Sequence, residues 1–311
     1  MTSQRDAFIS RLFERAKNDK DIYLISVDMG APSLDRWREE LPEQFFAAGI
    51  SEQNAINFAA GLSAAGKKVY VYFMACWAAR CYEQIRYSCA IAENPITILG
   101  NGVGLGYSPA GPAHNPTEDI AYMRTLCGIE IYSPCNSDMA IKLADLTCEQ
   151  PKLRYIRLER TSAQEVEDVS YDFETIESGI NCLRETDEEY PSVCIMSSGY
   201  MLGRALKVAE KIKEYPVAVV DLFRTKPIDG TVFEEIVEEY DYIVTLEEQT
   251  LSGGFGSVVC ETLSDLGLGR EVLRIGLPEG YIFQNASRDH LLDNNGLSVE
   301  AICEQIDEFV E

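Results

Sequence analysis

A glutamate at the start of a predicted helix is the first group in this chain that could do chemistry. The run Gly49-Ile50-Ser51-Glu52-Gln53-Asn54 precedes a stretch rich in alanine and glycine that extends to Gly66. The Ser51 hydroxyl is predicted to cap this helix, which makes Glu52 one of its first residues. A carboxylate there complements the helix dipole, and that alone is a sufficient structural reason for it. The small side chains behind Glu52 also let a neighbouring backbone or a flat ligand come close.

A histidine in a glycine- and proline-rich loop is the second candidate. His114 lies in the run 110–116, and His290 is the only other histidine in the chain. Most single histidines are hydrogen-bonded surface or core groups. This one is predicted between a strand and a helix, where α/β folds place their active sites. An imidazole there can donate or accept a proton near neutral pH.

A tryptophan and three arginines complete the candidates. Trp77 opens a helix predicted over residues 77–93, and its common role would be that of a core aromatic. Its indole face also suits a flat heteroaromatic ring. Arg157 and Arg160 end a predicted strand, where they either hold an anionic substrate group or pair with nearby acids. Arg5 is a weaker candidate for the same role.

Composition narrows the choice of partners. The chain has 311 residues, enough for about two domains, and a formal net charge of −24. Nucleic acids and anionic membranes both need a basic face, so neither is expected as a partner. A phosphorylated substrate is still possible, because one local pair of arginines can hold a phosphate in an acidic protein.

The cysteines and the hydrophobic pattern indicate a cytoplasmic protein. The chain has ten cysteines but no Cys-x-x-Cys, and with two histidines it shows no zinc spacing. We therefore expect no metal site in this chain, and reduced thiols that pack as small apolar residues. The N-terminus is charged, unlike a signal peptide, and no apolar run reaches the length of about 18 residues that a membrane helix needs.

Strands alternate with helices along the chain, which predicts an α/β protein with doubly wound, mostly parallel sheets. We expect a first domain over residues 1–165, a linker over 166–190 and a smaller second domain over 191–311. Residues 28–44 contain two prolines and are predicted to be an irregular loop. The predicted strands are 22–27, 68–74, 96–99, 129–132, 153–158, 193–196, 217–221, 242–246 and 272–275. The predicted helices are 4–18, 51–66, 77–93, 117–126, 138–149, 201–214, 230–239, 255–265 and 298–309.

Two of these stretches resemble motifs of transketolase-like thiamine diphosphate enzymes. Gly-Ile-Ser-Glu-Gln-Asn at 49–54, with the following Ala-Ala-Gly-Leu, is similar to the signature of their pyrimidine-binding domain. Gly-Pro-Ala-His-Asn at 111–115, with the following Glu-Asp, is similar to the Gly-Pro-Thr-His-Gln of transketolases and deoxyxylulose phosphate synthases. The resemblance implies a thiamine diphosphate pyrimidine-binding domain, followed by a smaller domain like the transketolase C-terminal domain.

The resemblance also assigns roles to residues. It implies that Glu52 contacts N1′ of the aminopyrimidine ring and that Trp77 stacks on this ring, where the family more often has phenylalanine. Gln53 and Arg80 are implied to lie in the same cofactor site. His114 is implied to contact the cofactor and the reacting carbonyl.

Further matches concern the substrate and the second domain. Arg160 matches an arginine at the same strand end in transketolases, which makes it the candidate for a substrate phosphate or carboxylate. The run Leu-Glu-Glu-Gln at 246–249, with Gly253 and Gly254, looks like part of the family's C-terminal domain. That glycine turn is either an anion site or a tight turn into a packed helix, and the turn is favoured. Contact within a dimer is the expected role of this domain.

The motifs of one half of a complete transketolase are missing from this chain. Members of the family bind Mg²⁺ and the diphosphate through Gly-Asp-Gly and a later Asn-Asn. No Gly-Asp-Gly occurs here, so the run Asp293-Asn294-Asn295 has no upstream counterpart. The resemblance therefore implies a separate N-terminal subunit that carries Gly-Asp-Gly and Mg²⁺, and a dimer of heterodimers.

The loop also departs from the family pattern. Transketolases usually place Glu-Asp before the Gly-Pro and a histidine further upstream, where this chain has Pro109, Ala110 and Gly102. Those groups hold sugar hydroxyls in the family, so we expect a specialised sugar as substrate. Two further stretches are slightly more similar to the beta subunits of 2-oxoacid dehydrogenases: Asn101-Gly102 and the run Ser-Pro-Cys-Asn-Ser at 133–137.

The resemblance thus implies a beta-type, C-terminal subunit of a heteromeric transketolase-like enzyme. It would transfer a ketol unit from a ketose to an aldehyde, and only together with its partner. One alternative is the beta subunit of a 2-oxoacid dehydrogenase or a related decarboxylating carboligase, which would release CO₂ from a 2-oxoacid. The other is a non-catalytic homologue that binds a partner.

Overall fold

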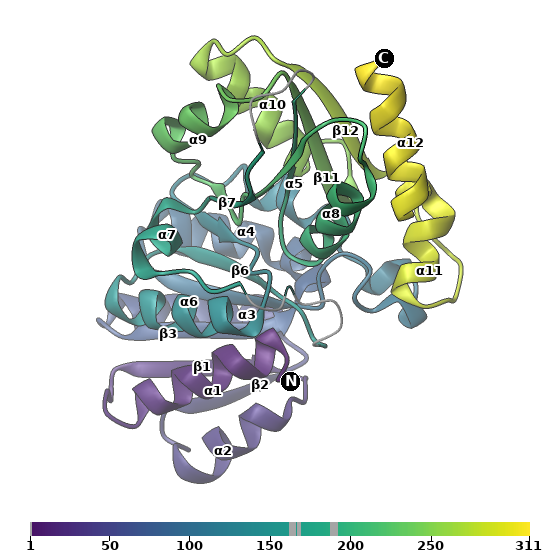
Figure 1. Cartoon of the computed structure of the whole chain (residues 1–311). Helices are drawn as coiled ribbons and strands as arrows, with labels where there is room; N and C mark the ends of the chain where they lie inside the picture. The colour runs from purple at the N-terminus through teal and green to yellow at the C-terminus, as the bar shows by residue number, and fades with distance from the viewer. Residues whose placement is uncertain (1, 162–165, 167–168, 187–191) are drawn as a thin grey trace. The chain divides into compact units, whose positions relative to one another are not determined.

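The chain folds into two compact units, which Figure 1 colours from purple to yellow along the sequence. The structure is a computed structural model that describes residues 2–161, 166, 169–186 and 192–311. The first unit is formed by residues 1–103 and 122–163, and the second by residues 104–121 and 164–311. The second unit therefore extends beyond the predicted domain 191–311 and includes the loop that carries His114.

A parallel sheet with the strand order β5-β6-β4-β3-β1-β2 forms the centre of the first unit. The strand β3 (Lys68–Met74) has the predicted bounds, and its neighbours differ from prediction by at most two residues at an end. Helices cover both faces of this sheet, which confirms the predicted doubly wound fold. The remaining strands are β1 (Ile22–Val27), β2 (Phe45–Gly49), β4 (Ile96–Asn101), β5 (Glu130–Tyr132) and β6 (Arg154–Leu158).

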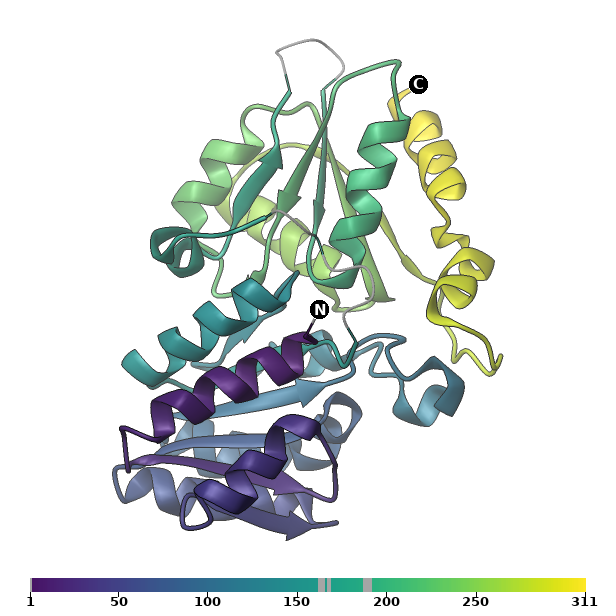
Figure 2. The same cartoon turned by 60° about the horizontal axis from the view of Figure 1, so that its bottom comes forward.

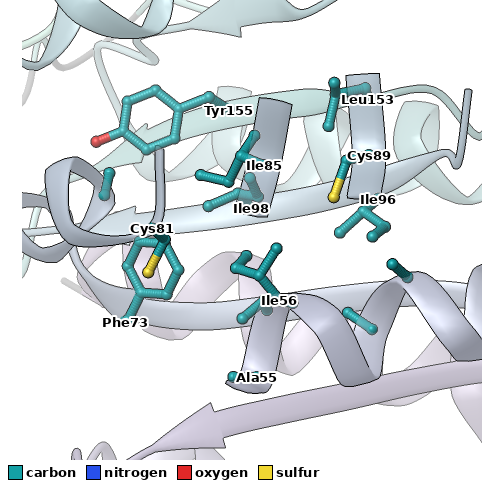
Figure 3. Packing of buried hydrophobic residues seen from close by; sticks show 14 of the residues in the cluster. Ala55, Ile56, Phe73, Cys81, Ile85, Cys89, Ile96, Ile98, Leu153 and Tyr155 are labelled. Atoms are coloured by element: carbon teal, nitrogen blue, oxygen red, sulfur yellow. The ribbon is translucent and has the colours of Figure 1, made fainter. Parts of the chain in front are cut away.

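The alternation of side chains along β3 divides the first unit into two cores. Val71 and Phe73 point to the face covered by α3 (Glu52–Ala64), where Figure 3 shows Ile56 and Ile98 packed together. Tyr70 points to the opposite face and contacts Thr147 through its hydroxyl, at 3.1 Å. That face is covered by α1 (Gln4–Ala16) and α6 (Ser137–Glu149), which lie side by side in Figures 1 and 2.

The predicted loop over residues 28–44 is wrong, because this stretch contains the helix α2 (Pro32–Glu40). Pro32 is the first residue of this helix, where a missing N–H removes no hydrogen bond. Trp37 is fully buried and packs edge-on against Phe13 of α1, with ring centroids 5.7 Å apart. Burial of this indole stabilises a helix that the sequence did not predict, because the two prolines are typical of a loop.

The predicted helix over residues 77–93 is helical but irregular. It begins as a 3₁₀ segment η1 (Ala75–Cys81), continues through one turn α4 (Tyr82–Gln84) and ends as a π-helical segment η2 (Ile85–Ile91). Cys81, Ile85 and Cys89 recur every four residues and pack into the α3-side core, as Figure 3 shows. Burial raises the pKa of both thiols to about 12, so they stay protonated at neutral pH. None of the ten cysteines, all of which lie in the described part of the chain, forms a disulfide, and these two pack as apolar residues.

The second unit is built on a sheet with the strand order β12-β11-β8-β9-β7. All pairs are parallel except β7–β9. Within this unit Figures 1 and 2 show α8 and α12 on one face and α9 and α10 on the other. The strands are β7 (Asn181–Arg184), β8 (Val193–Ser197), β9 (Val217–Asp221), β11 (Tyr242–Thr250) and β12 (Glu271–Leu277), with a short β10 (Arg224–Lys226). The helices are α7 (Phe173–Ser178), α8 (Tyr200–Lys211), α9 (Gly230–Val237), α10 (Phe255–Leu266), α11 (Arg288–Leu292) and α12 (Val299–Val310).

The predicted linker over residues 166–190 is more than a connection. Its described part includes α7 and the edge strand β7, which completes the second sheet. Residue 165, the predicted end of the first domain, and residues 187–190 lie outside the described part of the chain. Along the described residues, no helix has the length and the apolar composition needed to cross a membrane.

Candidate active site

The sequence-predicted residues of the first unit lie at the carboxyl edge of its sheet. Glu52 follows β2, Trp77 and Arg80 follow β3, and Arg157 and Arg160 lie in and after β6. Strands in a sheet are about 4.8 Å apart, so β3 and β6, with β4 between them, are separated by about 10 Å. Open α/β sheets bind ligands at this edge.

Glu52 begins α3 and is buried, with 4% of its surface exposed. The predicted cap is only half right: Ser51 holds the N-cap position, but its hydroxyl donates to the Ala48 carbonyl at 2.6 Å and makes no bond to the helix. The first turn of α3 thus has no side-chain cap from Ser51, and the Glu52 carboxylate is the acidic group of that turn.

Arg80 joins Glu52 to the other predicted residues. Its guanidinium donates to Glu52 Oε2 at 3.0 Å, and its carbonyl accepts from Gln53 Nε2 at 3.1 Å. The same guanidinium lies over the Trp77 ring, 4.7 Å from the ring centroid. The structure therefore brings Glu52, Gln53, Trp77 and Arg80 together, although the first pair and the second pair come from different helices.

Trp77 presents one side to the core and has Arg80 against its ring. Its indole packs against the α3-side cluster, while the Arg80 side chain over the ring is 47% exposed. A cation–π contact at an exposed site contributes about 0.5–1 kcal/mol, so a ligand ring can replace the guanidinium at little cost. The geometry suits a flat heterocycle that exchanges places with Arg80 and meets the buried carboxylate.

This exchange predicts a fluorescence signal from one of the two tryptophans. We expect thiamine diphosphate to quench the emission of Trp77, because an aromatic ring would take the place of the guanidinium. Trp37 is fully buried in the α2 contact and supplies the control. Quenching measured in the assembled enzyme should persist in Trp37→Phe and disappear in Trp77→Phe. Equal quenching in both variants would contradict the stacking role of Trp77.

The three candidate arginines differ in their exposure to solvent. Arg157 is buried within β6 and donates to Ser133 Oγ at 3.0 Å. Arg5 pairs with Asp6 at 2.6 Å, although its backbone N–H bonds to the Glu159 carbonyl and places it beside the end of β6. Arg160 is exposed and follows β6 by two residues. It is therefore the best placed of the three to meet an anionic substrate.

His114 belongs to the second unit, in the segment 104–121. It is half-buried and ends a short 3₁₀ turn, Pro112–His114, that follows Gly111. Gly111 has a φ of +79°, a conformation that favours glycine. The His114 N–H then bonds to the Gly111 carbonyl at 3.0 Å, which fixes the backbone of the histidine.

Asn115 is a residue that the sequence reasoning did not single out. It has 6% of its surface exposed, and among the described residues neither its amide oxygen nor its amide nitrogen has a hydrogen-bond partner. A buried polar group without a partner costs about 1–3 kcal/mol, and such groups gather at functional sites. The motif contains this asparagine, but its burial depends on the tertiary fold and has no signal in the sequence.

The glycine turn before α10 is a structural turn, as favoured from the sequence. Both oxygens of Glu247 accept from the helix N-terminus, from Phe255 N at 2.6 Å and Gly256 N at 2.9 Å. An internal carboxylate thus already fills the place of an anion. The run 293–295 is also structural: Asp293 pairs with Arg204 at 2.6 Å, and the Asn295 amide bonds to the Leu291 carbonyl. Within the described ranges, no cluster of three or more His, Cys, Asp or Glu side chains could hold a metal ion.

Comparison with known families finds two domains in the chain. Residues 1–165 match the model of the transketolase pyrimidine-binding domain, and residues 184–302 match that of the transketolase C-terminal domain. The first match alone covers more than half of the chain.

Relatives agree with this division. An apulose-4-phosphate transketolase subunit of Phocaeicola vulgatus is 33% identical over 315 residues, which cover 100% of this chain and 98% of that protein. The 1-deoxy-D-xylulose-5-phosphate synthase of Methylacidiphilum infernorum is 30% identical over 303 residues, 96% of this chain but 47% of the synthase, so the chain spans about half of such an enzyme. A solved structure described as a split gene transketolase, inactive beta4 tetramer, has a TM-score of 0.85 at 27% identity and covers 99% of this chain and 98% of that one. The chain therefore belongs to the transketolase family and has the domains of the beta subunit of a split transketolase.

Proposed function

We propose that this chain binds the pyrimidine half of thiamine diphosphate and transfers ketol units together with a separate N-terminal subunit. The partner would carry Gly-Asp-Gly and hold Mg²⁺ with the diphosphate, and the assembly would be a dimer of heterodimers. Support comes from the relative in Phocaeicola vulgatus, which is named as one subunit of a transketolase and which this chain matches over its whole length. Support also comes from the absence of Gly-Asp-Gly in the sequence.

The observation that carries the proposal is the buried Glu52 carboxylate beside Trp77 and Arg80. The residues fit the aminopyrimidine ring: a carboxylate can share a proton with a ring nitrogen, and an indole can stack on the ring. When bound, the cofactor supplies the electron sink for cleavage of a carbon–carbon bond next to a carbonyl. Glu52 then holds a proton at the ring, and Arg80 moves from the indole to make room.

Two residues serve the substrate in this proposal. His114 hydrogen-bonds the reacting carbonyl oxygen and moves its proton, a task for which an imidazole is suited. Arg160 holds an anionic group of the sugar at the end of β6. The relative's name contains a phosphorylated sugar, so we propose a phosphorylated ketose as the donor. Gly102, Pro109 and Ala110 shape a loop that differs from ordinary transketolases, which favours a specialised sugar.

The proposed place of action is the cytoplasm. The ten cysteines, all among the described residues, form no disulfide, which fits a reducing compartment. We also propose that the C-terminal domains of two copies of this chain contact each other in the dimer of heterodimers.

The test is reconstitution with an N-terminal subunit that carries Gly-Asp-Gly. We expect the purified complex, but not this chain alone, to bind thiamine diphosphate with Mg²⁺ and to transfer a ketol unit from a phosphorylated ketose to an aldehyde. Release of CO₂ from a 2-oxoacid without ketol transfer would favour the decarboxylating alternative. If the N-terminal subunit binds the cofactor equally well with and without this chain, the non-catalytic alternative would be favoured.

A further inference from the structure

The segment that carries His114 is fastened to the second unit at both ends. In sequence, residues 104–121 lie between β4 and β5 of the first sheet, yet they pack with the second unit. Hydrogen bonds to this segment come from the carboxyl end of β11, where Glu248, Gln249 and Thr250 follow one another, and Ile120 packs into the core of the second unit.

The beginning of the segment is held by Glu248. Its Oε1 accepts from the Leu105 N–H at 3.1 Å, and both its oxygens accept from Arg288, with Nε at 2.8 and 3.1 Å. The side chains of Glu248 and Arg288 are only 7% and 10% exposed, so the ion pair is shielded from solvent. Gly104 has a φ of +54°, which favours glycine, and a Cβ placed there would clash with the Glu248 carboxylate. A side chain at this position would therefore strain the backbone and push the carboxylate aside.

The end of the segment is held by the next two residues of β11. Gln249 Nε2 donates to the Pro116 carbonyl at 3.2 Å, and the Thr250 N–H donates to the Thr117 carbonyl at 2.9 Å. Gln249 is buried, with 2% of its surface exposed. Pro116 is two residues from His114, so these bonds hold the backbone that directly follows the histidine.

We propose that Gln249 and Glu248 are positioning residues for His114, and that the second unit contributes to catalysis by holding this loop. The inference rests on the proposed role of His114. It gives the C-terminal domain a task beyond dimer contact, because a loop held at two points presents its imidazole in one orientation. A misplacement of about 1 Å at a reacting centre can lower a rate by about 100-fold.

The lead variant is Gln249→Ala, which removes the bond to Pro116 and leaves the buried ion pair intact. Gly104→Ala is the second variant, because its Cβ would displace the Glu248 carboxylate at the other end of the loop. Ser298→Ala is the matched control: it removes the N-cap of α12, a bond of 3.1 Å from Ala301 N to the Ser298 hydroxyl, in the same unit. In the assembled enzyme we expect Gln249→Ala to lower kcat by about 10-fold, with KM for the donor within about 2-fold of the wild type.

A readout independent of activity uses the two histidines of the chain. With ¹³C-labelled histidine, the protein gives two ring signals, and His290→Ala assigns them. Gln249→Ala and Gly104→Ala should move the His114 signal and leave the His290 signal in place, while Ser298→Ala should move neither. A merely structural role of Gln249 would lower the melting temperature as Ser298→Ala does, without moving the His114 signal.

The outcomes separate this inference from the proposed function. An unchanged His114 signal and an unchanged kcat in both loop variants would overturn the proposal that Gln249 and Glu248 position His114. The His114 signal could also move in the variants while even the wild-type complex transfers no ketol unit. That result would support the positioning of His114 by Gln249 and Glu248 and would reject the proposed function. A lower kcat with a moved His114 signal would support both.

Discussion

Glu52→Gln should abolish ketol transfer in the assembled enzyme, lowering kcat by about 10²–10⁴-fold, the contribution typical of a positioned proton-transfer group. Glutamine keeps the size of the side chain and can still accept from Arg80, which is 3.0 Å from Glu52 Oε2. It cannot hold an acidic proton at a ring nitrogen. The loss should therefore fall on kcat more than on assembly with the partner, and it is measured by steady-state kinetics at saturating cofactor.

The control for this variant is Glu39→Gln, another change of carboxylate to amide in the same unit. Glu39 is exposed on α2, so its replacement should leave kcat unchanged. Both variants should melt close to the wild type, because glutamine keeps the size of Glu52 and can still accept from Arg80, and Glu39 is exposed. Full activity of Glu52→Gln would remove the central assignment of the site.

Sequence patterns predicted most strands because an apolar run of strand length has a local cause, but β2, β7 and β10 were not predicted. The strand β3 matches its prediction at both ends, and its aliphatic and aromatic residues run without interruption after Lys67 and Lys68. The sequence does not predict the helix α2, because two prolines in residues 28–44 are typical of a loop. Pro32 is compatible with a helix start, but the reason for the helix is the contact of Trp37 with Phe13, which depends on a helix elsewhere in the sequence.

The candidate site also has features that the sequence predicts and features that depend on contacts between distant residues. Motifs placed Glu52 and His114 on loops and helix starts, and these positions hold in the structure. No motif indicated that the His114 loop belongs to the second unit. Its anchors are distant in sequence: Leu105 and Glu248 are 143 residues apart, and Pro116 and Gln249 are 133 apart. Arg80 and Trp77 are close in sequence, but the Arg80 side chain is also held by Glu52, 28 residues away, and this arrangement has no signature in the sequence.

His114→Ala should lower kcat by about 10²–10³-fold, because the reacting oxygen would lose both a hydrogen bond and a proton-transfer group. A second variant separates these two roles. His114→Gln keeps an amide that can donate a hydrogen bond but that cannot move a proton near neutral pH. If the histidine only polarises the carbonyl, the glutamine variant should regain much of the lost rate; we expect it to stay close to the alanine variant.

The other histidine provides the control for both variants. His290 is exposed in α11 and lies 2.9 Å from the Asn294 amide, so His290→Ala should keep the wild-type kcat. A loss of rate in His290→Ala equal to that in His114→Ala would show a general effect of losing an imidazole from this chain. Glu52 and His114 reside in different units, and each variant removes one of them. A double variant Glu52→Gln/His114→Ala should therefore lose far less than the product of the two single losses if both groups serve the same step, because residues that act as a unit are not additive.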